Sequence, residues 1–146
     1  MASPPYGWRE GVRRPVRMKL DKDSADIVVG DFLSVTGFTA GYVGQAAAGE
    51  IPVGVAMEKV VVSGTADGDH SVLVDVSEDS IYEYPPDAGT VTQALAHTTM
   101  DIGGPQSINI DASADDIVVV RDVDTVANTL RVSLYSGAAT RYLGVV

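Results

Sequence analysis

The sequence predicts a small all-β protein, a single-domain β-barrel, β-tulip-like barrel or sandwich with an extended N-terminal arm. Two observations predict this class. Short runs rich in β-branched and aromatic residues recur along the chain, and clusters of Gly, Pro and Asp separate them. No stretch shows the apolar period of 3.6 residues that marks a helix. Many short strands at such intervals are typical of a barrel or sandwich.

The beginning of the chain differs from the rest. Three prolines and two glycines interrupt the first 17 residues and favour an extended segment over a helix. We therefore divide the 146 residues into an extended basic arm, residues 1–17, and one β domain, residues 18–146. A domain of this size can bury a hydrophobic core.

Within the β domain, the pattern predicts strands over residues 31–36, 53–62, 71–76, 80–84, 117–121 and 129–135. The last of these alternates most clearly, because Leu130, Val132 and Leu134 share one face of a strand. Residues 92–98 suit either one helical turn or another strand. The apolar end of the chain, residues 141–146, is expected to close the sheet.

Charge is distributed unevenly. Residues 1–22 hold six basic and two acidic side chains (+4), and residues 23–146 hold four basic and eighteen acidic ones (−14), which sum to the net −10 of the chain. An acidic body repels nucleic acid, so we expect no nucleic-acid partner. The apolar runs are too short to cross a bilayer, and the N-terminus has no apolar signal-peptide region, so no membrane partner is expected. There is no cysteine to form disulfides.

Three kinds of site chemistry find little support. The two histidines, His70 and His97, are not in a paired ligand motif, and the acidic clusters lack EF-hand spacing. Asp69-His70-Ser71 contains the residue types of a catalytic triad, but neighbours on a strand face opposite sides. Lys59 follows a run similar to that of biotinyl carrier domains, interrupted by a Glu. The sequence therefore predicts no enzyme, and no catalytic, cofactor-binding or metal-binding residues.

Four segments carry a family resemblance. Residues 29–35 (VGDFLSV) and 47–56 (AAGEIPVGVA) resemble an opening Gly-Asp strand and the turn and strand that follow it. Residues 101–111 (DIGGPQSINID) and 127–132 (ANTLRV) are similar to later segments of the same proteins. The family that these segments resemble is that of the head decoration proteins, or capsid cement proteins, of tailed bacteriophages.

The resemblance implies a structural protein without enzymatic activity. Proteins of this family are added to the outside of an expanded capsid and stabilise it against the pressure of packaged DNA. The implied partners are the major capsid protein and further copies of the chain, usually as a homotrimer and sometimes as a dimer. The implied location is the outer capsid surface of the virion, after synthesis in the host cytoplasm.

Under this interpretation the arm contacts the capsid or a neighbouring subunit. Seventeen extended residues reach on the order of 55 Å. Aromatic side chains dominate interface energetics, and arginines pair with carboxylates. The expected contact residues are therefore the two aromatic and four arginine side chains of the arm: Tyr6, Trp8, Arg9, Arg13, Arg14 and Arg17.

Two alternatives stay open. The first is a phage fibre or baseplate β module that binds a host glycan or protein, which predicts an exposed aromatic cluster. Tyr82 and Tyr84 are the one aromatic pair expected on a single strand face. The second alternative is a small β-barrel enzyme, which predicts titratable groups gathered in a pocket.

Overall fold

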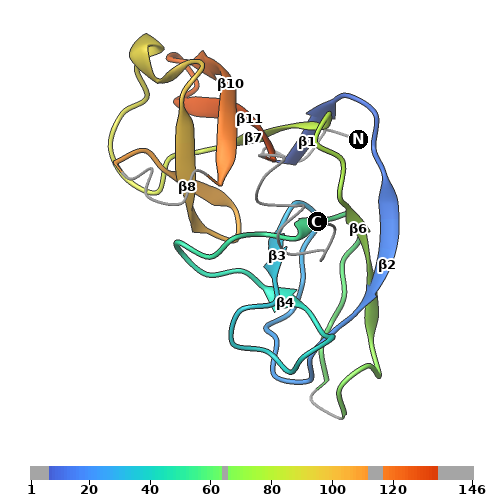
Figure 1. Ribbon diagram of the computed structural model, residues 1–146. Helices are drawn as coiled ribbons and strands as arrows, with labels where there is room; N and C mark the ends of the chain where they lie inside the picture. The colour runs from blue at the N-terminus through green and yellow to red at the C-terminus, as the bar shows by residue number, and fades with distance from the viewer. Residues whose placement is uncertain (1–6, 64–65, 112–116, 135–146) are drawn as a thin grey trace.

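Two antiparallel sheets build the protein (Figure 1). The computed structural model describes residues 7–63, 66–111 and 117–134. The six-stranded sheet has the order β1-β7-β11-β10-β8-β9, and the five-stranded sheet has the order β2-β6-β5-β3-β4. The elements are β1 (Gly7–Glu10), β2 (Pro15–Lys19), β3 (Phe32–Ser34), β4 (Gly44–Gln45), β5 (Gly54–Ala56), β6 (Ser71–Asp75), β7 (Ile81–Tyr84), the single-turn 3-10 helix η1 (Gln93–Leu95), β8 (Thr99–Gly104), β9 (Ser107–Asn109), β10 (Val118–Asp124) and β11 (Thr129–Leu134).

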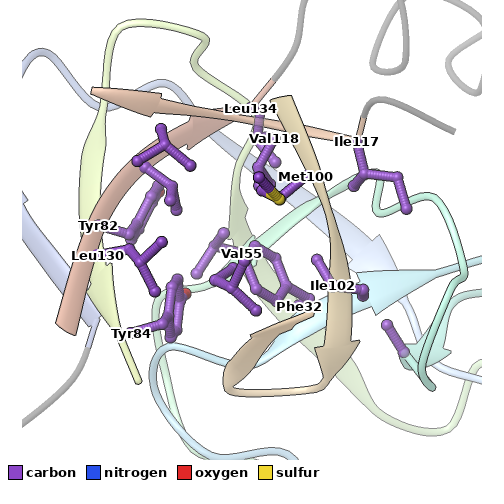
Figure 2. Close-up of a cluster of buried hydrophobic side chains, with 14 of the residues drawn as sticks. Phe32, Val55, Tyr82, Tyr84, Met100, Ile102, Ile117, Val118, Leu130 and Leu134 are labelled. Carbon is purple, nitrogen blue, oxygen red and sulfur yellow. The ribbon is translucent and has the colours of Figure 1, made fainter. Parts of the chain in front are cut away.

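The main core lies between the two sheets (Figure 2). The six-stranded sheet contributes most of it, including Tyr82, Ile102 and Leu130, which are almost completely buried. Phe32 and Val55 reach this core from the five-stranded sheet. Along β7, β8, β10 and β11, every second side chain points into this core.

A second core covers the opposite face of the five-stranded sheet. Leu33 of β3 and Ala56 of β5 follow Phe32 and Val55 directly, so they point the other way and pack with Leu20 and other apolar residues. The centre of the five-stranded sheet is therefore buried on both faces, so every residue of β3 and β5 is buried, whereas the edge strand β2 is largely exposed.

The predicted all-β class is confirmed, and it takes the form of two packed sheets rather than a closed barrel. The predicted run over residues 53–62 is shorter than expected, since β5 ends at Ala56. Just beyond it, the Glu58 carboxylate accepts the N–H of Leu73 at 3.0 Å. A side chain thus occupies the place of a backbone carbonyl, and the ladder between β5 and β6 ends there. Residues 92–98 contain the helical turn η1 rather than a strand.

The N-terminal segment is extended, as predicted, but it is part of both sheets. β1 pairs with β7, and β2 pairs with β6 along its whole length. The expected division between residues 17 and 18 therefore falls inside β2, and the described part of the arm belongs to the same folded unit as the body. Tyr6 and the C-terminal stretch, residues 141–146, lie outside the described residues.

Candidate functional site

The N-terminal segment crosses from one sheet to the other at residues 11–14, between β1 and β2. Gly11 begins this crossover with φ +97°, a conformation that side chains rarely adopt. A Cβ at this position would lie 2.1 Å from the carbonyl oxygen of Asp79. Glycine is therefore required here both by its backbone conformation and by the close approach of the β6–β7 turn.

A buried carboxylate anchors the crossover. Asp75 ends β6, and its side chain is 0% exposed. Four groups donate hydrogen bonds to it: the backbone N–H groups of Arg14 (2.9 Å) and Ser77 (3.0 Å), and the hydroxyls of Ser80 (2.6 Å) and Tyr82. These donors come from the crossover, from the β6–β7 turn and from the neighbouring sheet, so one carboxylate joins all three.

The hydrogen bonds keep this carboxylate charged. Burial by itself would raise the pKa of Asp75, but the Arg14 N–H, the two hydroxyls and the Ser77 N–H outweigh it, and the pKa lies below the ordinary 3.8. The pKa of Tyr82 is raised, mainly by burial and also by its hydrogen bond to Asp75. Tyr82 therefore stays a neutral donor and Asp75 a charged acceptor.

Arg13 connects this buried site to the surface. Its Nε lies 3.5 Å from the Asp75 carboxylate, and its guanidinium lies over the Trp8 ring, 4.9 Å from the centroid. Trp8 is opposite Tyr82 in the pairing of β1 with β7 and remains 38% exposed. Arg13 thus links Trp8 to Asp75, a contact that the local sequence pattern does not reveal.

Two more of the predicted arginines pair with carboxylates of the same chain. Arg9 Nε lies 3.2 Å from Glu83, which also accepts the hydroxyl of Thr129. Arg17 forms an ion pair of 3.0 Å with Glu58. The basic segment therefore offsets carboxylates of the acidic body, and the charge asymmetry of the sequence was the signal for this pairing.

The two strands of the N-terminal segment each form an outer edge of one of the two sheets. β2 is the outer strand of its sheet, with Pro15, Arg17 and Lys19 along it. β1 is the outer strand of the other sheet, and its pairing is shifted by an irregularity between Trp8 and Glu10. Proline, charged side chains and bulges are common means of preventing strands of other molecules from adding to an edge.

Three of the four segments that carry the family resemblance meet near a second buried carboxylate, Asp31, which directly precedes β3. Asp31 accepts the N–H of Val28 at 2.9 Å and the side-chain amides of Gln45 (3.0 Å) and Gln106 (2.8 Å). Two backbone bonds, Phe32 N–H to the Pro105 carbonyl (2.8 Å) and Gly49 N–H to the Ile102 carbonyl (3.0 Å), join the same segments. Residues 29–35, 47–56 and 101–111 therefore form one junction between the sheets.

The candidate triad residues do not assemble. His70 Nε2 is 2.8 Å from the hydroxyl of Ser63, whereas the hydroxyl of Ser71 accepts a hydrogen bond from Arg17. Within residues 7–63, 66–111 and 117–134, no three metal-ligating side chains gather into a group that could hold an ion. The same described residues contain no helix long and apolar enough to span a bilayer.

No protein-family model matches the chain, and neither a curated protein nor a solved structure is significantly similar to it.

Proposed function

We propose that this chain is a structural protein of a tailed-phage virion that binds the outer surface of the expanded capsid and stabilises it. Its partners under this proposal are the major capsid protein and neighbouring copies of itself. No catalytic role is assigned to any residue.

The observation that carries the proposal is the junction around Asp31. Three of the four segments that resemble capsid cement proteins come from separate parts of the sequence, yet they are joined there by direct hydrogen bonds. Segments that are connected in space form one structural unit, so their resemblance is better explained by a shared fold than by unrelated short matches. This supports the fold of the family, and the function follows by analogy.

The alternative glycan-binding module loses its main candidate surface. Tyr82 and Tyr84 do share a strand face, but that face is the core, where they are 1% and 0% exposed. Their rings pack against each other with centroids 6.2 Å apart. A buried pair cannot stack on a sugar, so we do not propose this function.

Cosedimentation with expanded, undecorated heads of tailed phages tests the proposal. The protein is expected to pellet with heads and to saturate at a fixed number of copies per capsid subunit. Decorated heads should resist thermal disruption better than bare ones. If the full-length protein saturates none of a panel of expanded heads, the proposed function is wrong. Removal of residues 1–17 is not a suitable variant, because it would delete β1, most of β2 and the Arg13 and Arg14 groups that contact Asp75.

A further inference from the structure

The crossover presents an exposed apolar and cationic tip. Val12 is 77% exposed, and the neighbouring Arg14 is also exposed. Arg9, Arg13 and Arg17 pair with carboxylates of the chain, but the guanidinium of Arg14 has no ion pair among the described residues. An arginine left unpaired on a protein of net charge −10 is available to a carboxylate of another molecule.

The tip is held rigidly although its side chains are exposed. Arg14 donates its N–H to Asp75 (2.9 Å), and its carbonyl accepts the N–H of Val76 (3.0 Å). The carbonyl oxygen of Val12 lies 3.4 Å from the Ser80 hydroxyl, which donates its proton to Asp75. The backbone is thus ordered before any partner binds, which lowers the entropic cost of association.

We propose that residues 11–14 are a preformed docking element for an acidic, partly apolar protein surface. This inference rests on the proposed function, under which that surface belongs to the outer face of the capsid shell. Val12 supplies the apolar contact, and Arg14 supplies a charge-assisted hydrogen bond to a carboxylate. Strand addition at β2 is not the mode of binding, because Pro15 and the charged residues protect that edge.

Two double variants test this element. Val12→Ser with Arg14→Gln removes the apolar and cationic side chains but keeps the backbone bonds of the crossover. The matched control, Val126→Ser with Lys59→Gln, removes one valine that is 97% exposed and one exposed lysine from other parts of the surface. Both variants change the net charge by the same amount, and thermal unfolding should show that both retain the stability of the unaltered protein.

Affinity for expanded heads is then measured by cosedimentation. The tip variant is expected to bind about tenfold more weakly than the unaltered protein, the loss typical of truncated interface contacts, while the control binds as before. The unaltered protein should also lose more affinity with added salt than the tip variant does. Equal binding by both variants would overturn the docking element and leave the proposed function standing. No head binding by the unaltered protein would overturn both.

Discussion

The hydroxyl of Tyr82 donates a hydrogen bond to the carboxylate of Asp75, and both side chains are buried. Tyr82 belongs to the six-stranded sheet and Asp75 to the five-stranded sheet, so this contact joins the two layers. The same carboxylate also accepts the N–H of Arg14 from the crossover. One charged group therefore fastens both sheets and the N-terminal segment.

Asp75→Asn should lower the free energy of unfolding by at least about 1.5–3 kcal/mol, the usual contribution of one hydrogen bond to a charged group. The NH2 group that replaces one carboxylate oxygen cannot accept the hydrogen bonds made to that oxygen. Arg13 also loses the negative charge that faces it. Urea unfolding measures the loss. Asp79→Asn is the control, because Asp79 is exposed on the following turn and should change stability by no more than about 0.5 kcal/mol. Similar losses in both variants would contradict the anchoring role.

Tyr82→Phe should be more destabilising than Tyr84→Phe. Both hydroxyls are buried on β7, but Tyr82 donates to a carboxylate and Tyr84 donates to the backbone carbonyl of Gly30 at 2.6 Å. Hydrogen bonds to charged groups contribute about 1.5–3 kcal/mol, and neutral ones about 0.5–1.5 kcal/mol. If chemical denaturation gave a larger loss of stability for Tyr84→Phe than for Tyr82→Phe, the hydrogen bond from Tyr82 to Asp75 would not be the stronger of the two.

Low pH should remove the contribution that the Asp75 carboxylate makes to the free energy of unfolding. Its pKa is lower in the folded than in the unfolded protein, so folding is favoured while the carboxylate is charged. The contribution is present above the unfolded pKa of 3.8 and is lost as the pH falls through the lower folded pKa. The free energy difference between the unaltered protein and Asp75→Asn should therefore be constant from pH 7 to about pH 5 and should narrow below pH 4.

Asp21 also has a lowered pKa, owing mainly to the N–H of Thr39. Because Asp21 is present both in the unaltered protein and in Asp75→Asn, its effect on stability cancels in the difference between them. A difference that stays constant down to pH 2 would mean that Asp75 is not held in its charged form.

Gly11→Ala should destabilise the protein more than Gly41→Ala. Both glycines have positive φ values, +97° and +91°, so each alanine costs about 1–2 kcal/mol in backbone strain. A Cβ at Gly41 meets nothing within 4 Å, whereas one at Gly11 would lie 2.1 Å from the carbonyl oxygen of Asp79. Overpacking of this kind adds about 1–3 kcal/mol. Equal midpoints of thermal unfolding would argue against the close packing of the crossover.

The local pattern of the sequence was enough to predict the strands with regular alternation. Residues 71–76, 80–84 and 129–135 correspond closely to β6, β7 and β11. β8 was not predicted, because its two final glycines and its buried Asp101 depart from the expected composition of a strand. β4 has only two residues and depends entirely on its pairing with β3, which no local pattern reveals.

The role of the N-terminal segment depended on long-range pairing. Its prolines and glycines indicated an extended chain, but an extended chain can be a free arm or an edge strand. The difference lies in Glu83, Asp75 and Glu58, which are separated from their arginines by 41 to 74 positions. The opposite charges of the segment and the body were visible in the sequence, although the individual partners were not.

Hydrogen exchange on the isolated full-length protein tests most directly whether the basic segment is a built-in part of both sheets. If β2 is part of the sheet, the Arg14 N–H and the amides of Val16 and Met18, the β2 residues whose N–H groups face β6, are protected to the same order as those of β6. If the amides of residues 8–18 exchanged at the rate of an unstructured peptide while those of β6 and β7 stayed protected, the segment would be a free arm and not part of the sheets.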